Sequence, residues 1–189
     1  YLKTLRDKEN FMPSRILDVG AWNGFWTNNV KPIWPGAEYT CIEAGSKHEQ
    51  KLKLVTPNYH IAVLGDSNRE VKMYLREIDK GNKKKITYTK GSSLFGQRQT
   101  RDELVGADAQ YDLIKQDVQG AEIMVMKGAP EIFKRAKYVI QEVNIDKDKS
   151  FPDMPDEKEM DDYMSTLGFS NSEVIEKKEN VDQIDKIYF

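Results

Sequence analysis

Apolar and polar positions near the start of the chain predict a strand, a turn and a helix in close succession. Residues 16–19 ("ILDV") form a short, mostly apolar run that stops at Gly20. Residues 24–30 continue with a helical pattern, which must end close to Pro32 because proline does not fit inside a helix. The same order of elements then recurs along the chain.

The next two apolar runs predict further buried strands. They cover residues 37–44 and 59–65, and a helix is expected between them at 46–55, with Ser46 as its N-cap. Strands that alternate with helices in this way are joined by right-handed crossovers. The pattern therefore predicts a parallel sheet covered by helices on both faces.

The middle of the chain departs from this rhythm. Residues 69–78 and 84–90 alternate polar with apolar positions, and a charged segment containing glycine joins them, which predicts an inserted β-hairpin. The elements expected after it are a strand at 111–117, one or two helices within 119–136 broken near Pro130, a strand at 137–143, an acidic helix within 150–168 that Gly168 can cap, and a closing antiparallel pair at 172–178 and 183–189.

Domain organisation and composition indicate one globular domain. The sequence shows no internal repeat and no long linker, so residues 1–189 are expected to form a single domain, with residues 1–14 as an N-terminal helical extension. The chain of 189 residues and 21.8 kDa is 39% hydrophobic and 32% charged, which excludes the disordered and membrane classes. These values suffice for one packed core.

The net charge and the first residues of the chain indicate which binding partners and which cellular compartment to expect. The net charge of −2 and the pI near 5.8 argue against nucleic acid, because binding to phosphate backbones is driven by Lys and Arg. The first residues contain no apolar signal region and no membrane span, which favours the cytoplasm. The first residue is Tyr1 rather than Met, as in a piece of a longer chain.

Cysteine and histidine give no support to a metal site. Cys41 is the only cysteine and lies in an apolar stretch, so we interpret it as a small core residue rather than a nucleophile. His48 and His60 have no partners at metal-ligand spacing, and no zinc site is predicted.

An aspartate and two glycines at the end of the first strand raise the question of a ligand. In open α/β sheets, ligands bind beyond the carboxyl ends of the strands. Asp18, Gly20 and Gly24 form D-x-G-x-x-x-G, which differs from the dinucleotide fingerprint G-x-G-x-x-G, and an ordinary strand-to-helix turn remains an alternative. Glu43 ends the second strand, where its carboxylate suits a ribose diol, although an isolated glutamate there could be surface charge.

Two more acidic residues end later strands. Asp117 follows an apolar run and precedes a helix start, so it either faces a ligand or caps that helix. Glu142 repeats the pattern on the next strand. A carboxylate in an apolar strand costs several kcal/mol unless it is hydrogen-bonded, metal-bound or solvated, which favours a site at this edge.

Six segments, in order and spacing, resemble the FkbM family of S-adenosylmethionine-dependent methyltransferases. They are "ILDVGAWNGFWT", "CIEAGS", "IAVLGD", "GSSLF", "DLIKQDVQGAEIMVMKGAPEIF" and "VIQEV", and the resemblance covers residues 15–169. It implies an α/β, Rossmann-like class I methyltransferase fold: a seven-stranded, mostly parallel sheet with an antiparallel last strand, here with the inserted β-hairpin. It also implies O-methylation of a hydroxyl on a sugar, glycan or polyketide-like small molecule.

The resemblance assigns roles by position. It would place the amino-acid part of the cofactor at Asp18, Gly20, Ala21, Trp22, Asn23 and Gly24. The ribose would lie at Glu43 and Ala44, and the adenine at Ala62, Val63 and Asp66. The methyl group and the acceptor would lie at Asp117 and Glu142, the two catalytic candidates, and Asp117 would also lie near the cofactor. The chain departs from the usual family residues at Trp22, Ala44, Arg101, Gln116 and Gln119, and the last lacks the usual acid.

The chemistry of methyl transfer agrees with these residues and leaves alternatives open. An enzyme of this kind aligns donor and acceptor and removes a proton from the acceptor, which suits a carboxylate such as Asp117. A divalent cation could assist instead, although the sequence does not support one. A catalytically inactive cofactor-binding module is a second interpretation. A nicotinamide-dependent oxidoreductase is a third, but it would need G-x-G-x-x-G and a catalytic Tyr-Lys or His.

Overall fold

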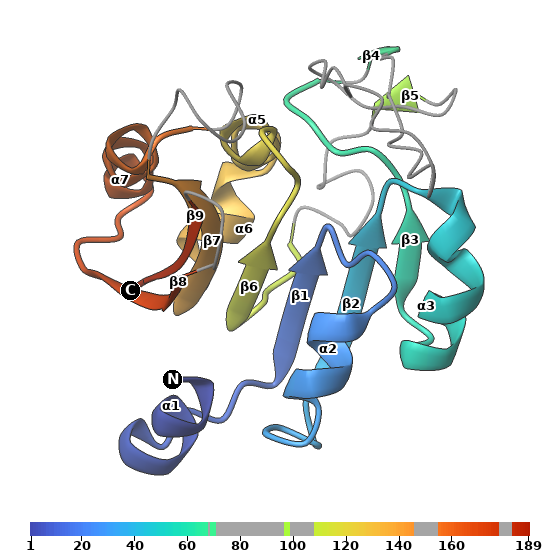
Figure 1. The fold of residues 1–189 in the computed structure, drawn as a ribbon, viewed down its shortest axis with the longest axis horizontal. Coiled ribbons are helices and arrows are strands. Elements are labelled where there is room, and N and C mark those ends of the chain that lie inside the picture. The colour runs from blue at the N-terminus through green and yellow to red at the C-terminus, as the bar shows by residue number, and fades with distance from the viewer. Residues whose placement is uncertain (68, 71–96, 99–107, 146–154, 178–182) are drawn as a thin grey trace, which may run out of the picture.

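The computed structural model describes residues 1–67, 69–70, 97–98, 108–145, 155–177 and 183–189, and its main feature is one seven-stranded sheet (Figure 1). The strand order is β3-β2-β1-β6-β7-β9-β8. The strands are β1 (Arg15–Val19), β2 (Glu38–Glu43), β3 (Tyr59–Ile61), β6 (Leu113–Gln116), β7 (Tyr138–Asn144), β8 (Ser172–Lys177) and β9 (Gln183–Tyr188). Each corresponds to a predicted strand, although β3 and β6 are shorter than expected.

The direction of the strands confirms the mostly parallel sheet. β3, β2, β1, β6 and β7 are parallel to one another, and β9 is antiparallel to both of its neighbours, β7 and β8. The order of strands changes direction between β1 and β6, whose register pairs Asp18 with Lys115. The carboxyl ends of β1, β2, β6 and β7 therefore meet at one edge, the edge at which open α/β sheets bind ligands.

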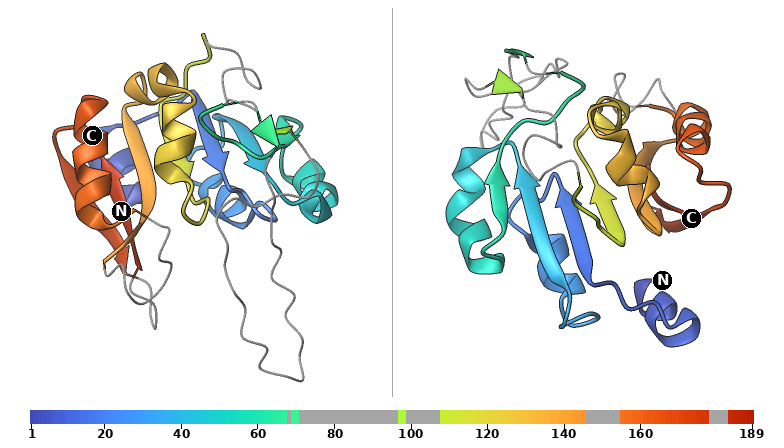
Figure 2. Two further views of the ribbon diagram at one scale, coloured as in Figure 1. Left: turned by 90° about the horizontal axis from the view of Figure 1, so that it is seen from above. Right: turned by 180° about the vertical axis from the view of Figure 1, so that it is seen from behind.

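Helices cover both faces because neighbouring strand residues point to opposite sides. Ile16 packs with Val30 and Trp34, whereas Leu17 belongs to the core that contains Ile132 and Phe133. α2 lies in front of β1 and β2 in Figure 1 and behind them in the rear view of Figure 2. The helices are α1 (Leu2–Glu9), α2 (Phe25–Val30), η1 (Ser46–His48), α3 (Glu49–Val55), α5 (Glu122–Lys127), α6 (Pro130–Lys134) and α7 (Glu157–Thr166).

Helix ends follow their local signals in most places. Pro130 is the first residue of α6 and separates it from α5, as predicted. α7 begins with a capping box between Asp156 and Glu159 and ends at Thr166; Gly168 follows the C-cap Leu167, and its φ of 100° allows the chain to turn. Ser46 was wrongly predicted as the N-cap of the second helix: it begins the short 3-10 turn η1, and the N-cap of α3 is His48.

The insertion after β3 is described only at its ends. β4 (Arg69–Glu70) pairs antiparallel with β5 (Gln97–Arg98). The rest of the predicted hairpin, at 71–78 and 84–90, and Arg101 lie outside the described residues.

The N-terminal segment packs against the amino ends of the strands. α1 buries Leu5, and the following Phe11 meets Trp34 edge-on, with the ring centroids 5.6 Å apart. Nε1 of Trp34 donates to the carbonyl of Phe11 at 2.9 Å. This helix and its contacts lie at the edge of the sheet opposite the carboxyl ends of β1, β2 and β6 (Figure 1).

Candidate active site

Backbone contacts hold the loop between β1 and α2 against its neighbours at the carboxyl edge. The N–H groups of Gly20 and Ala21 both donate to the carbonyl of Ile42 on β2, at 2.9 and 3.0 Å. Gly20 has a φ of 78°, and a Cβ on it would lie 1.8 Å from the carbonyl oxygen of Asp117. The close approach of two backbone segments therefore requires glycine at this position.

The rest of the loop is also shaped by contacts within the chain. Gly24 has a φ of 77°, and a Cβ on it would lie 2.5 Å from Cγ2 of Val55 on α3. Oδ1 of Asn23 accepts the N–H of Phe25 at 3.1 Å, at the start of α2. Ala21 is buried in a small core formed with α3. These contacts account for the second glycine of the motif without a ligand.

Glu43 ends β2 and turns its carboxylate toward this loop. Oε2 accepts the backbone N–H of Trp22 at 2.8 Å, and Oε1 accepts that of Gly45 at 2.7 Å. The two bonds orient the carboxylate, and each of its oxygens retains a second lone pair. Glu43 is half-buried, so the side chain is oriented by the fold before any ligand binds.

Trp22 stands beside Glu43 in a backbone conformation that bulky residues rarely adopt. Its φ is 50°, its side chain is 57% exposed, and its ring meets that of His48 edge-on, with the centroids 5.9 Å apart. Burial lowers the pKa of His48, against the opposing effect of Glu43. A Cβ on Gly45 would lie 3.1 Å from both Oε1 of Glu43 and Cδ2 of His48, so the imidazole flanks the carboxylate.

Asp18 lies below the loop and has partners inside the protein. It is 1% exposed, and its Oδ2 accepts a hydrogen bond from the hydroxyl of Thr27 at 2.7 Å. Its Oδ1 is 3.7 Å from Nζ of Lys115. Burial raises the pKa of Asp18, and Lys115 and Thr27 only partly oppose this effect. This aspartate links β1 to α2 and β6 at the base of the site.

Lys115 is a buried cation that lies between two carboxylates. Its Nζ is 3.3 Å from Oδ2 of Asp117 and 3.7 Å from Oδ1 of Asp18. Burial alone would lower the pKa of the ammonium group, but the attraction of Asp18 and Asp117 outweighs it and raises the pKa. Lys115 therefore remains charged and connects β1 to the end of β6.

Asp117 and Glu142, the predicted catalytic residues, are brought together by a single side chain. Nε2 of Gln119 donates to Oδ1 of Asp117 at 2.8 Å and to Oε2 of Glu142 at 2.5 Å. Gln183 on β9 also donates to Oε2 of Glu142, at 3.4 Å. The alternative role of Asp117 as a helix cap is not found, because the N-cap of α5 is Ala121.

The loop that carries Gln119 folds around the buried carboxylate of Glu122. The N–H groups of Val118 and Gly120 donate to Oε1 of Glu122 at 3.1 and 3.2 Å, and that of Gly120 also reaches Oε2 at 2.9 Å. Burial raises the pKa of Glu122 to about 7, although these backbone donors oppose the effect. The carboxylate fixes the conformation of the loop between β6 and α5.

The residues predicted to border the adenine lie after β3. The N–H of Ala62 donates to the carbonyl of Glu43 at 2.9 Å, which places this part of the chain next to the predicted ribose acid. Ala44, Ala62 and Val63 are half-buried. Asp66 lies farther along, is exposed, and accepts a hydrogen bond from the hydroxyl of Ser67 at 3.1 Å.

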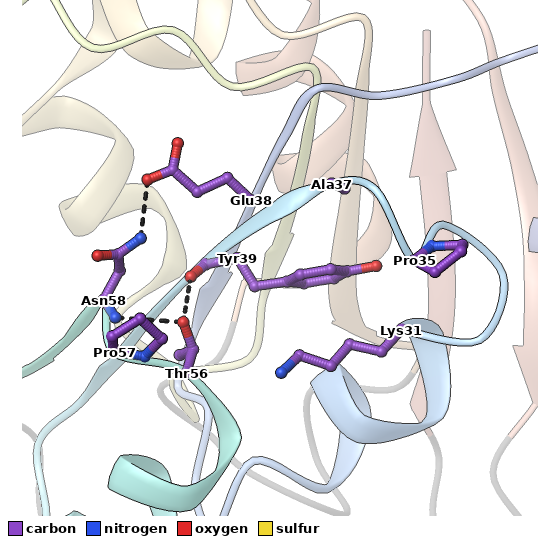
Figure 3. A pocket seen from close by; sticks show the side chains of 8 residues that line it. All are labelled: Lys31, Pro35, Ala37, Glu38, Tyr39, Thr56, Pro57 and Asn58. Carbon is purple, nitrogen blue, oxygen red and sulfur yellow. Dashed lines mark hydrogen bonds between the residues drawn. The ribbon is translucent and has the colours of Figure 1, made fainter.

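A hollow of about 460 Å³ lies at the other end of β2 (Figure 3). Its polar side chains bind other protein groups: Asn58 donates to Glu38 at 2.7 Å, and the hydroxyl of Thr56 donates to the carbonyl of Tyr39 at 2.7 Å. Lys31 donates to the carbonyl of Val55. Because it borders the amino end of β2, this hollow is separate from the site at the carboxyl edge.

Two kinds of feature are absent from the described ranges of the chain. Within them, no group of three or more His, Cys, Asp or Glu side chains is arranged to hold a metal ion. No helix in the same ranges has the length and apolar character needed to cross a membrane.

Comparison with known proteins identifies the family. The family model described as the methyltransferase FkbM domain matches residues 18–170. The chain belongs to the FkbM methyltransferase family. The matched range contains Asp18, Glu43, Asp117 and Glu142, and it confirms the resemblance seen in the sequence. No curated protein sequence gives a significant match to this FkbM-family chain.

Solved structures confirm the fold of this FkbM-family chain. It is similar to a candidate O-methyltransferase from Nostoc punctiforme (TM-score 0.50, 14% identity, 99% of this chain and 54% of that one). It also resembles a candidate O-methyltransferase from Klebsiella pneumoniae (0.54, 12%, 99% and 77%) and a precorrin-6y C5,15-methyltransferase from Geobacter metallireducens (0.52, 11%, 99% and 83%). The chain thus spans about half the length of the Nostoc protein.

Several residues at the site were not found by sequence reasoning. Thr27, Glu122 and Gln183 were not singled out, although each binds one of the predicted carboxylates or its loop. The spacing of Lys115 and Asp117, two residues apart on a strand, does indicate that their side chains share one face. Gln183 carries no such signal, because its contact with Glu142 depends on the pairing of β9 with β7.

Proposed function

We propose that this FkbM-family protein is an S-adenosylmethionine-dependent O-methyltransferase. The observation that carries the proposal is the carboxylate of Glu43, which two backbone N–H groups orient beside the β1–α2 loop. Its two remaining lone pairs suit the two hydroxyls of a ribose. The loop that donates the Trp22 N–H to this carboxylate follows β1 at the carboxyl edge, which supports placing the amino-acid part of the cofactor along Asp18–Gly24.

The carboxylates at the ends of β6 and β7 support the assignment to transfer onto oxygen. S-adenosylmethionine would supply an electrophilic methyl group on a sulfonium ion. Asp117 and Glu142 would orient the acceptor hydroxyl and take its proton while the oxygen forms its new bond to carbon. Carboxylates are also strong hydrogen-bond acceptors for neighbouring hydroxyls, which favours a sugar, glycan or polyketide-like acceptor.

Binding and turnover measurements on the wild-type protein test the proposal in two steps. Calorimetry with S-adenosylhomocysteine is expected to show binding, whereas NAD under the same conditions is expected to show none. Transfer of a labelled methyl group is then measured with a panel of sugars, glycans and polyketide-like alcohols, each matched with its methyl ether as a control. Binding of NAD alone would contradict the proposal, and binding of S-adenosylhomocysteine without transfer to any acceptor would favour an inactive cofactor-binding module.

A further inference from the structure

The amide group of Gln119 connects two carboxylates that come from different strands. Its single Nε2 atom donates to Oδ1 of Asp117, which follows β6, and to Oε2 of Glu142 on β7. Two carboxylates within reach of one nitrogen repel each other when both are ionised. The two N–H groups of the amide reduce this repulsion, because each donates to a different carboxylate.

The backbone holds Gln119 in this position at some cost. Its φ is 55°, in the left-handed region that favours glycine, and the following Gly120 has a φ of 104°. The buried carboxylate of Glu122 accepts hydrogen bonds on both sides of Gln119, from Val118 and Gly120. Backbone strain of this kind persists only where the surrounding structure imposes it. The loop therefore presents the amide of Gln119 to the two carboxylates.

Other charged and polar groups face the same pair. Lys115 on β6 lies 3.3 Å from Asp117, and the buried Asp18 on β1 lies behind that lysine. On β9, Gln183 donates to Glu142, and Asp185 is the register partner of Glu142. Glu122 also acts electrostatically on the same region, since Asp117 contributes to its raised pKa. Carboxylates thus outnumber the one described cation, Lys115, in this cluster.

We propose that Gln119 is a positioning residue that couples Asp117 and Glu142 into one proton-accepting pair, a role that rests on the proposed function. The acceptor O–H bond breaks, its proton goes to the pair, and the oxygen forms a bond to the methyl carbon. The bond between that carbon and sulfur breaks, and its electrons stay on the sulfur. Two coupled carboxylates bind protons as a unit, with apparent pKa values that belong to the pair.

Carboxyl titration followed by ¹³C NMR tests the coupling without an acceptor. In protein labelled at Asp and Glu, the signals are assigned with Asp117→Asn and Glu142→Gln. Gln119→Met removes the donors but keeps the length of the side chain, and Gln119→Gly removes them while relieving the positive φ. Both are expected to raise the apparent pKa values of the pair by about one unit, because donors to the ionised form are lost.

A matched control makes the outcome decisive. The control is Gln50→Glu, at an exposed position of α3. This variant is expected to leave the titration of Asp117 and Glu142 unchanged. Unchanged titration in both folded Gln119 variants would overturn the proposal.

Methyl transfer to an acceptor found in the panel is expected to fall about tenfold or more in both variants. In the pH profile of the methyl-transfer rate, the fall in rate on the acid side should move to higher pH. The size of this movement should equal the change in the apparent pKa values measured in the titration.

Calorimetry separates this inference from the proposed function. Both Gln119 variants are expected to bind S-adenosylhomocysteine within about threefold of wild type, and a loss of more than about tenfold would assign Gln119 to the cofactor site instead. If the wild-type protein binds no S-adenosylhomocysteine, the proposed function fails. The titration would then still decide whether Gln119 couples the two carboxylates.

Discussion

Glu43 is a residue that the fold orients while leaving it open to a ligand. Because a ribose diol would donate two hydrogen bonds to a charged acceptor, Glu43→Gln is expected to weaken S-adenosylhomocysteine binding by about 1.5–3 kcal/mol. Calorimetry measures the change. Glu131→Gln serves as the control, since Glu131 is exposed on α6 and paired with Lys134. Unchanged affinity in folded Glu43→Gln would remove this residue from the cofactor site.

Asp117 allows the reaction to be separated from cofactor binding. Asp117→Asn keeps the shape of the side chain but loses the ability to take a proton. We expect turnover to fall by roughly 10²- to 10⁴-fold, while the affinity for S-adenosylhomocysteine stays close to wild type. Methyl-transfer kinetics and calorimetry on the same preparation measure both. Turnover within a few-fold of wild type would assign proton removal to another group, and a joint collapse would place Asp117 in the cofactor site.

The sequence predicts which carboxylates reach the carboxyl edge but not what binds them. Asp117 directly follows β6, and Glu142 lies near the carboxyl end of β7, the neighbouring parallel strand. Their proximity follows from the register that pairs Gln116 with Gln141. The bridge through Gln119 depends on a positive φ that a glutamine gives no reason to expect. The contact from Gln183 spans the pairing of β7 with β9, which no local pattern specifies.

The loop between β6 and α5 depends on the ionisation of Glu122. The pKa of this carboxyl is about 7 in the folded protein against 4.5 as the ordinary value, so the folded state holds the proton more tightly. The stability that protonation contributes is present in full below pH 4.5 and is lost as the pH rises through 7. The pKa difference corresponds to about 3 kcal/mol.

Urea denaturation across this pH range tests the role of Glu122. Glu122→Gln can still accept a hydrogen bond from the loop, but it does not titrate. We expect its free energy of unfolding to exceed that of wild type increasingly as the pH rises from 4.5 to 8. The contributions of the other carboxyl groups to the pH dependence are the same in both proteins, so they cancel in the difference between the two free energies of unfolding. A constant difference between the two proteins over the range would show that Glu122 does not titrate there.

At the scale of elements, local signals predict helix breaks better than helix starts. Pro130 and Gly168 act through their own backbone geometry, and both predictions are confirmed. Ser46 fails as an N-cap because the chain first makes a 3-10 turn, so α3 starts later. The glycines at 20 and 24 are explained by Asp117 and Val55, and these contacts are made by segments distant in sequence.

At the scale of the whole molecule, the N-terminal helix α1 and the proposed cofactor site lie at opposite edges of the sheet (Figure 1). Leu5 is fully buried in the core beneath the amino ends of the strands. Leu5→Ala is expected to lower the free energy of unfolding by about 2–5 kcal/mol, because it removes packed methyl groups. The affinity for S-adenosylhomocysteine at low temperature should not change. Denaturation and calorimetry measure the two effects.

A leucine on the surface provides the control for this prediction. Leu54 on α3 is 88% exposed, and Leu54→Ala is expected to change stability by less than about 0.5 kcal/mol. A loss of cofactor affinity in folded Leu5→Ala would show that the two edges are coupled through the sheet.

The architecture as a whole was predicted better than its details. Short apolar runs alternating with helical segments require a parallel sheet with two covered faces, and the two cores on either side of β1 agree with this. The family resemblance implied seven strands with an antiparallel last one, but the order of the strands was not predicted, since the runs alone do not determine which strand lies next to which. The interior of the insertion lies outside the described residues, so its predicted hairpin remains a prediction.

The position of β9 makes it the link between β8 and the parallel strands of the sheet. β8 precedes β9 in the chain, but in the described sheet it pairs with β9 and not with β7. β8 is therefore attached to the parallel strands only through β9 in this sheet. β9 also supplies Gln183 to the site, so a nascent chain that lacks this strand has both an unfinished sheet and an unfinished carboxylate pair. Even when every other residue of the site is in place, Glu142 lacks the hydrogen bond from Gln183 until β9 is present.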